Sequence, residues 1–458
     1  MKKTNLILIQ VFVLCFLISG SAWADLFDTY GFGAKGMAMG GALCASVDDS
    51  SGIYYNPAGL GDMKREHYLG FSYLYTMPSM TISGPILDTP KNSDLAMGMI
   101  VIDMAFDINK VAKLPVPVTF GLGLSLKDDL GLVNVEDVDE SRPRFLQFGS
   151  ALKRTNIYMG VGSEIFKDFL WFGAGAHAMI GGKAVASLGI SAEDLSTDKD
   201  VIPSEQDIWM DLKAEMNPIV GFVISPIEDL KLGFSYKDDI AVDIDPFNAP
   251  INLHIGDNVA TITAYTAILA YWNPKSYRAG ASYTLDNLTI EFDIVLEQWS
   301  DFKRNVPYEM RRSCPKFDDI ILYRIGVEKN LSDIILYTWE RVTIKDNKVI
   351  DRESIEAPSG DIKLTNVKLW GGYQFVPSPV PEQTGASNYL DCDRHIVSFG
   401  CGAEFKDPFG IVLNPIGISF AFQDQYLPER KINKEDSSYN YTVNGNVMSC
   451  YFSLKLTM

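Results

Sequence analysis

The sequence predicts an all-β protein, a transmembrane antiparallel β-barrel of about 14 strands. Two observations lead to this prediction. Apolar and polar residues alternate with a period of two along many segments of about 10 to 15 residues, the length that a tilted strand needs to cross a bilayer. No run of eighteen or more apolar residues follows residue 24, so the sequence offers no helical membrane span.

The predicted strands have one apolar face and one polar face. In Val118–Lys127, five apolar side chains share one face, and glycine, serine, threonine and lysine share the other. The same period recurs in Lys231–Lys237, Ser276–Leu285, Leu288–Glu297, Ile321–Lys329, Val367–Phe375 and Val397–Phe405. A soluble β-sandwich also alternates, and it would turn its charged mid-strand residues toward water. The number and length of the strands favour the barrel.

Polar segments rich in Asp, Ser and Pro predict loops between the strands, at Ser191–Gln206, Asp238–Pro250 and Glu340–Asp361. The last segment predicts a final membrane strand. Its alternate residues are apolar up to the carboxyl end: Met448, Cys450, Phe452, Leu454, Leu456 and Met458. Outer-membrane barrels commonly end on a strand of this kind with a terminal aromatic residue, whereas this chain ends on methionine.

Residues 1–24 predict a cleaved signal peptide. Two lysines precede an apolar stretch from Leu6 to Ile18, and Ala22 to Ala24 supplies small residues for cleavage. Export also argues against a nucleotide-binding interpretation of residues 31–36, which spell G-x-G-x-x-G. That pattern would lie about six residues from the mature N-terminus, with no strand before it to form a dinucleotide-binding turn.

The composition argues against several classes of function. The formal net charge is −18, whereas nucleic-acid binding needs a basic surface. The six cysteines are too scattered for a disulfide-stapled domain. Cys392 and Cys401 suggest a metal site at first sight, but they lie roughly 30 Å apart along an extended strand. The sequence therefore predicts no cofactor, no metal, no catalytic residue and hence no enzyme.

The segment after the predicted signal peptide reads GFGAKGMAMGGALCASVDDSSGIYYNPAGL from Gly31 to Leu60, with a glycine-rich lead and two aspartates before Asn56-Pro57-Ala58. In these features it resembles the FadL family of outer-membrane transporters of long-chain fatty acids and other hydrophobic compounds. Further matches lie at Glu297–Phe302, Tyr323–Lys329 and Gly371–Phe405. The segment Asp128–Asn217 matches the family weakly.

The resemblance implies a barrel whose N-terminal segment folds inward as a hatch. We therefore expect a signal peptide at 1–24, a hatch at 25–62 and a barrel at 63–458. The hatch residues that match the family pattern are Asn56, Pro57, Ala58 and Gly59. From the residues alone, an asparagine before proline predicts a compact capped turn that needs no chemistry.

The resemblance also implies a route for the ligand. The ligand would be captured near the outer loops, pass into the lumen and leave sideways into the bilayer beside a kinked third strand. We place the kink at Gly121 and Gly123 in the third predicted strand, because glycine weakens a strand locally.

A fatty acid would need a cation in the lumen to meet its carboxylate. The strand parity makes Arg278 and Arg324 candidates, with Lys368 behind them. The alternative is that these cations only balance lumen carboxylates, as charges commonly do inside barrels. Those carboxylates are Glu291, Asp293 and Glu328.

The sequence thus predicts passive uptake of a hydrophobic small molecule, a long-chain fatty acid or an aromatic hydrocarbon, through a multi-pass barrel in the outer membrane of a Gram-negative cell. The expected partners are this ligand and outer-membrane lipid, and we expect a monomer. One alternative is a barrel of the same fold that acts in secretion or adhesion through its loops. A second alternative is a secreted soluble β-sandwich enzyme.

Overall fold

The computed structural model describes most of the chain between residues 26 and 457. The described residues are 26–63, 67–85, 90–128, 143–149, 155–191, 205–255, 258–302, 316–337, 339–345, 348–355, 362–385, 387–405 and 415–457. The predicted signal peptide and Met458 lie outside these ranges. In the part of the chain that the structure describes, no helix is long and apolar enough to cross a membrane.

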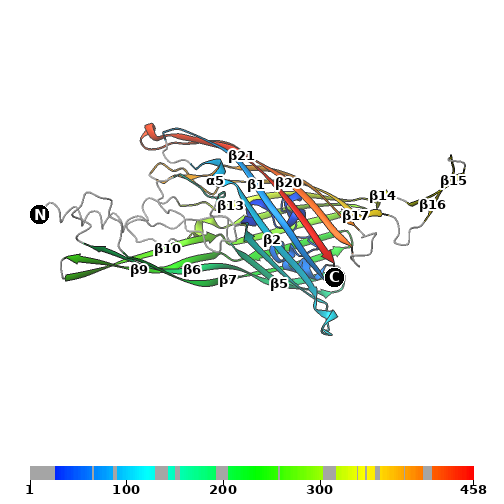
Figure 1. Ribbon diagram of the computed structural model, residues 1–458, viewed down its shortest axis with the longest axis horizontal. Helices are drawn as coiled ribbons and strands as arrows, with labels where there is room; N and C mark the ends of the chain where they lie inside the picture. Colours follow the sequence, from blue (N-terminus) through cyan, green and yellow to red (C-terminus); the bar gives the residue numbers. More distant parts are fainter. Residues whose placement is uncertain are drawn as a thin grey trace.

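Fourteen strands form one closed antiparallel β-barrel, which confirms the predicted fold class (Figure 1). In wall order they are β1 (Tyr68–Ser83), β2 (Met97–Asp107), β3 (Val118–Lys127), β5 (Asn156–Phe166), β6 (Leu170–Ser191), β7 (Glu205–Ile227), β8 (Leu230–Lys237), β11 (Ser276–Leu285), β12 (Leu288–Glu297), β13 (Ile320–Asn330), β17 (Ile362–Val376), β19 (Arg394–Phe405), β20 (Ile416–Ile432) and β21 (Tyr441–Thr457). The last strand pairs with β1 and closes the wall. Closure gives the backbone N–H and C=O groups of the edge strands hydrogen-bond partners, which lipid cannot supply.

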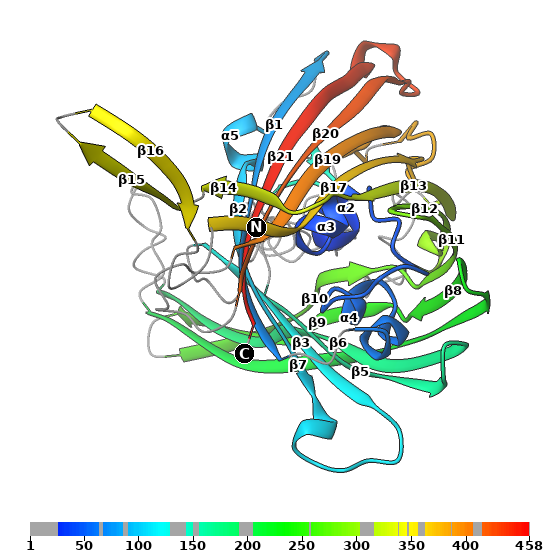
Figure 2. The ribbon, with the colours of Figure 1, turned by 90° about the vertical axis from the view of Figure 1, so that its right-hand side faces the viewer.

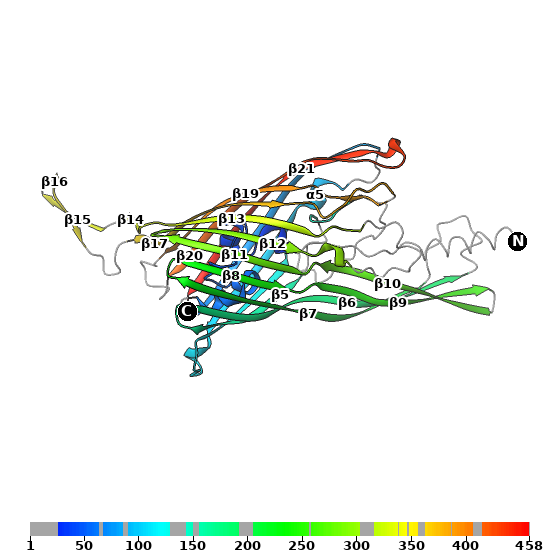
Figure 3. The ribbon, with the colours of Figure 1, turned by 180° about the vertical axis from the view of Figure 1, so that it is seen from behind.

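The other strands lie beyond the two ends of the wall. The β9–β10 hairpin (Ile240–Ile255 and Asn258–Asn273) rises between β8 and β11, which pair directly with each other. At the opposite end, β14 (Ile334–Tyr337) pairs with β17, and β15 (Trp339–Lys345) pairs with β16 (Lys348–Ile355) (Figure 3). Short turns and the C-terminus also lie at this end, which we call the periplasmic end because outer-membrane barrels place short turns there. The β9–β10 end is then the extracellular end.

Two of the predicted loops are wrong. Asp238–Pro250 contains most of β9, and Glu340–Asp361 contains β16 and most of β15. These strands project from the wall, so they have no membrane to impose a continuous apolar face. The alternation that identifies a wall strand is therefore weak in them. The remaining short elements are β4 (Arg144–Phe145), which pairs with β18 (Tyr389–Leu390), and four helical turns: α5 (Asn92–Leu95), η2 (Ile108–Lys110), η4 (Trp299–Asp301) and η6 (Ser437–Tyr439).

The outer face of the wall is apolar and the lumen face is polar. On β12, Ile290 and Phe292 are 44% and 46% exposed, whereas Glu291 and Asp293 between and beside them are at most 1% exposed. Phe452 on the last strand is 51% exposed. A broad apolar exterior of this kind is stable against lipid tails and not against water. The predicted apolar exterior is therefore confirmed.

Residues 26–61 fold inside the barrel as a hatch (Figure 2). The hatch contains α2 (Leu26–Tyr30), α3 (Gly33–Ala38), α4 (Gly52–Tyr55) and η1 (Pro57–Gly61). These helices have only four to six residues, too few to be stable alone. Burial stabilises them: Met37, Met39 and Ile53 have no exposed surface. The hatch and the wall thus share one interior.

Lumen-facing glycines leave room for the hatch backbone. A Cβ added at Gly173 would overlap the carbonyl of Pro57, and one added at Gly372 would overlap that of Met39. Several lumen-facing glycines stand opposite one another on neighbouring strands, and an added Cβ would meet the hatch backbone at some of them and hatch or wall side chains or wall backbone at others. The opposed pairs are Gly121 with Gly160, Gly162 with Gly173, Gly173 with Gly221, Gly233 with Gly280, and Gly326 with Gly372. Glycine weakens a strand, and the space that it leaves for the hatch accounts for its use here.

We predict that Gly372→Ala displaces the hatch, whereas Gly371→Ala does not. The two residues are neighbours on β17, but a Cβ at Gly371 meets no atom within 4 Å. Overpacking at Gly372 should cost about 1–3 kcal/mol. Limited proteolysis of the purified barrel should cut the hatch faster in Gly372→Ala and at the wild-type rate in Gly371→Ala. Equal rates in both variants would contradict the proposed close packing.

Candidate functional site: the hatch and the lumen wall

The Asn56-Pro57 turn joins two parts of the hatch to the wall. The Asn56 backbone is extended, and its side-chain oxygen accepts a hydrogen bond from the Ala58 amide at 3.1 Å, which caps η1 with Pro57 at its start. The Asn56 side-chain amide donates to the carbonyl of Cys44 at 2.7 Å and to that of Phe222 in β7 at 3.2 Å. The capped turn expected from these residues is present, and it is also a tether to the barrel.

Packing supports the same turn. Ala58 has no exposed surface and packs against Trp171 and Val223 of the wall. Gly59 lies against Val47, where an added Cβ would overlap the Val47 carbonyl oxygen. The small Ala58 therefore lets η1 lie close to β6 and β7, and Gly59 lets it lie close to the hatch backbone at Val47.

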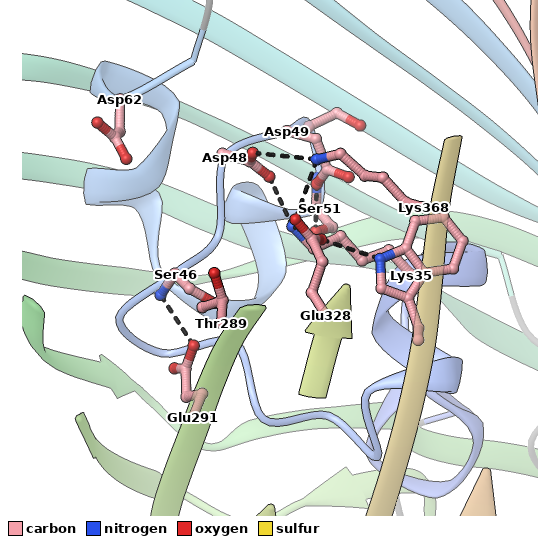
Figure 4. A network of polar contacts seen from close by, with 12 residues as sticks. Lys35, Ser46, Asp48, Asp49, Ser51, Asp62, Thr289, Glu291, Glu328 and Lys368 are labelled. Atoms are coloured by element: carbon pink, nitrogen blue, oxygen red, sulfur yellow. Dashed lines mark hydrogen bonds and ion pairs between the residues drawn. The ribbon is translucent and has the colours of Figure 1, made fainter. Parts of the chain in front are cut away.

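Two carboxylates of β12 bind the hatch backbone at the four consecutive amides of residues 43–46. Asp293 accepts from the first two, both at 3.0 Å, and Glu291 accepts from the last two at 2.6 Å and 3.0 Å. Figure 4 shows the contact of Glu291 with Ser46. We call this pair the carboxylate clamp. Burial raises the pKa of the Cys44 thiol, and the two carboxylates raise it further, so this thiol is neutral at physiological pH.

A second set of contacts, the Asp28 site, holds α2. Asp28 lies 2.9 Å from Arg278 and 2.7 Å from Lys237, and Asn273 donates to it at 3.3 Å. The Tyr54 ring lies 4.7 Å from the Arg278 guanidinium and 5.0 Å from the Lys237 ammonium. Burial acts to raise the pKa of Asp28, but the charges of Lys237 and Arg278 outweigh it and hold the pKa well below its usual range. Asp28 is therefore an anion held between two cations.

A charge network joins the hatch to β13 and β17 toward the periplasmic end (Figure 4). Lys35 of the hatch lies 2.7 Å from Asp48 and 3.0 Å from Glu328. Lys368 lies 3.1 Å from Glu328 and 3.9 Å from Asp48. Burial acts to lower the pKa of Lys35, but the neighbouring carboxylates outweigh it and raise the pKa above its usual range. The network is balanced, with two cations and two anions.

All three predicted lumen cations contact the hatch or its network. Arg278 holds Asp28, Lys368 pairs with Glu328, and Arg324 donates to the Gly41 carbonyl at 3.3 Å. The structure thus brings them to three separate places on the hatch rather than into one group. Their predicted role toward a ligand carboxylate stays a prediction.

Sequence reasoning missed Asp28 and Lys237. The strand parity that turns Arg278 inward also turns Lys237 inward, so parity could have found the lysine. Asp28 gave no such signal, because its partner Arg278 lies 250 positions away in the chain.

Gly121 and Gly123 lie in a continuous part of β3. The pairing of β3 with β2 and with β5 runs through both glycines without a register shift. Hatch side chains occupy the space over them: Ile53 and Leu60 lie at Gly121, and Ile53 and Phe32 lie at Gly123. These glycines thus leave the space in which apolar side chains of the hatch pack. The kink and the sideways opening stay predictions.

The lumen differs in character on the two sides of the hatch. Toward the periplasmic end, a cavity of about 370 Å³ lies between the hatch and β1, β2, β17 and β19 to β21. Charged groups from both line it: Lys35, Asp48, Asp103, Lys368 and Lys455. An apolar molecule would have to displace water from these charges in order to enter the cavity.

Toward the extracellular end, aromatic side chains form a buried cluster. Consecutive ring centroids lie 5.2–6.1 Å apart in this cluster, which contains Trp272, Trp299, Phe302, Phe317 and Tyr389. These residues come from the ends of strands and from connections at the extracellular end. Trp272, Trp299, Phe317 and Tyr389 are at most 2% exposed, so these rings cover one another beneath the extracellular loops.

These features define a transmembrane β-barrel of the outer-membrane type with an internal hatch. Solved structures with this fold include a FadL homologue of Pseudomonas aeruginosa, at 12% identity and a TM-score of 0.52 over 96% of this chain and 99% of that chain. The monoaromatic hydrocarbon channel CymD (13%, 0.52, 93% and 98%) and the toluene transporter TbuX of Ralstonia pickettii (14%, 0.50, 93% and 99%) are similar as well. No family model and no curated protein matches the sequence. The likeness confirms, at the level of the fold, the resemblance carried by Gly31–Leu60.

We predict that Arg278→Met loosens α2 and that a second substitution, Asp28→Asn, removes most of this effect. Arg278→Met leaves the buried Asp28 carboxylate with one cation fewer, at an expected cost of about 2 kcal/mol. Hydrogen exchange of the α2 amides in the four members of the double-mutant cycle should give a coupling of about 1–3 kcal/mol. A coupling near zero would show that the ion pair does not hold the helix.

Proposed function

We propose that this protein is a channel for passive uptake of hydrophobic small molecules across a Gram-negative outer membrane. The observation that carries the proposal is an apolar-faced closed barrel whose lumen is filled by an internal hatch. Such a barrel is a poor pore for water-soluble solutes, because the hatch occupies its cross-section. Two proteins of similar fold, the monoaromatic hydrocarbon channel CymD and the toluene transporter TbuX, support a hydrophobic ligand and a role other than catalysis.

Sideways exit into the bilayer fits the distribution of polar groups. The contacts of the hatch over Gly121 and Gly123 are apolar, whereas the cavity at the periplasmic end is charged. The free-energy cost for a hydrophobic ligand is therefore lower along β3 than through the cavity, where it would have to desolvate charged groups.

The wall strands beside this sector are short. The strands β2, β3 and β5 have 11, 10 and 11 residues, and β2 pairs with β1 only from Tyr68 to Thr76. Strand length alone does not select this sector, because β11 and β12 have ten residues each. The apolar hatch contacts over Gly121 and Gly123 are what favour it. In the proposed route, the aromatic cluster receives the ligand and the β3 sector releases it.

The ligand is a long-chain fatty acid or an aromatic hydrocarbon, and the Asp28 site distinguishes the two. Lys237 and Arg278 already hold a carboxylate, that of Asp28. The carboxylate of a fatty acid has the same charge and the same acceptor atoms, so it competes with Asp28 for these cations. An aromatic hydrocarbon has no group that could do so.

Uptake of the two ligand classes tests the proposed function. In a strain that lacks its own channels for these compounds, expression of the chain should increase accumulation of labelled dodecanoate, toluene or both several-fold. Deletion of residues 31–60 should change this uptake, since the hatch controls the lumen. Wild-type accumulation equal to that of the empty strain for both compounds would remove the transport proposal and favour a barrel that acts through its loops.

We predict that Asp28→Asn strengthens the binding of dodecanoate but not that of dodecanol. The substitution removes the competing carboxylate and leaves Lys237 and Arg278 for the ligand, which should strengthen dodecanoate binding by about tenfold, or 1.4 kcal/mol. Dodecanol is the matched uncharged ligand. Binding to purified protein in detergent can be measured by displacement of a fluorescent amphiphile. An equal change for both ligands would show that the Asp28 site does not bind a ligand carboxylate, and fatty acids would no longer be proposed ligands. Uptake of toluene would still support the channel.

A further inference from the structure

The carboxylate clamp is the contact between hatch and wall that a ligand is least able to replace. Glu291 and Asp293 accept four hydrogen bonds from consecutive backbone amides, at 2.6 Å to 3.0 Å. Both side chains are at most 1% exposed. Asn56 binds the Cys44 carbonyl from the other side, so the clamped segment is held from two directions.

Loss of the clamp would leave two neighbouring buried carboxylates without their donors. Glu291 and Asp293 lie two residues apart on the same face of β12, and a buried charge needs hydrogen bonds or a counter-charge. Arg324 stands opposite Asp293 in the pairing of β12 with β13, but it also donates to the hatch at Gly41. Departure of the hatch would therefore remove donors from both carboxylates at once.

The chemistry of the proposed ligands cannot supply the missing donors. A fatty-acid carboxylate offers only acceptors at neutral pH, and an aromatic hydrocarbon offers no hydrogen-bonding group. The Asp28 site differs in this respect, because a ligand carboxylate can take the place of Asp28 there. The two attachments of the hatch thus differ in kind: one can be replaced by a ligand and the other cannot.

We propose that Glu291 and Asp293 are positioning residues that keep residues 43–46 anchored throughout transport, so that the lumen opens by movement of the hatch segments on either side and never by expulsion of the hatch. This inference rests on the proposed uptake function. It divides the hatch into an arm from 26 to 42, a fixed segment from 43 to 46, and an arm from 47 to 61. The first arm carries the Asp28 site, and the second carries the Asn56 turn.

Hydrogen exchange of the wild-type protein in lipid nanodiscs tests the proposal without a substitution. The probes are dodecanoate and toluene, each at a saturating concentration. Peptides that contain the amides of residues 43–46 should keep their protection within about twofold with either probe, whereas α2 should exchange about tenfold faster with dodecanoate. Exchange at 43–46 that rises with a probe as much as exchange at α2 would overturn the proposal.

A variant with apolar side chains of similar size tests the role of the two carboxylates. Glu291→Met with Asp293→Leu removes the acceptors of all four hydrogen bonds. The matched control is Glu297→Met on the same strand, since that carboxylate accepts from the Trp299 indole rather than from the hatch backbone. The double variant should exchange at 43–46 about a hundredfold faster and label Cys44 with a small maleimide, whereas the control should match wild type at both places.

A gel-mobility assay of the folded barrel separates loss of the anchor from loss of the fold. A folded double variant with wild-type protection at 43–46 and an unreactive Cys44 would overturn the proposal. The double variant should also admit a small hydrophilic chromogenic substrate into cells that express it. Uptake of dodecanoate and toluene by wild type is measured in the same cells, so a failure of the anchor and a failure of the uptake function give different results.

Discussion

Close approach of the hatch backbone to the barrel wall is the constraint on which most of this structure depends. Segments around Met39, Cys44 and Pro57 lie so near the wall that the facing positions have no side chain. Rows of opposed glycines on the lumen face meet this requirement. On β12 the wall presents Glu291 and Asp293 instead, and these side chains bind backbone amides directly. Glycine and carboxylate are thus two solutions to one problem, the fit of a folded peptide inside a narrow barrel.

The sequence was sufficient to predict the fold class and several strands of the membrane wall. The predicted strands Val118–Lys127, Ser276–Leu285 and Leu288–Glu297 coincide with β3, β11 and β12 to the residue. Alternation is a local property, and the surrounding lipid enforces it on every strand that crosses the bilayer. The strands that rise above or below the bilayer lack this enforcement, and the sequence interpretation took parts of β9 and of the β15–β16 hairpin for loops.

The candidate site could be predicted only in part. Parity placed Arg278, Arg324 and Lys368 on the lumen face, where the structure has them. Parity could not show what they face, because their partners on the hatch are more than two hundred positions away in the chain, as for Arg278 and Asp28 at 250 positions. The hatch motif identified a capped turn at Asn56, which depends on neighbouring residues. The contact of Asn56 with Phe222 depends on the closed barrel and had no local signal.

The short strands of the wall have a consequence for the surrounding membrane. The ten residues of β3, at about 3.4 Å each and tilted by about 40°, rise about 26 Å, close to the apolar band of roughly 25 Å found in outer-membrane barrels. The 22 residues of β6 rise about twice as far. Hydrophobic mismatch therefore acts first beside the short strands, such as β3, β11 and β12, where a thicker bilayer must thin or fold lipid over the rim. Membrane thickness, as well as side chains, sets how this part of the barrel meets the outer leaflet.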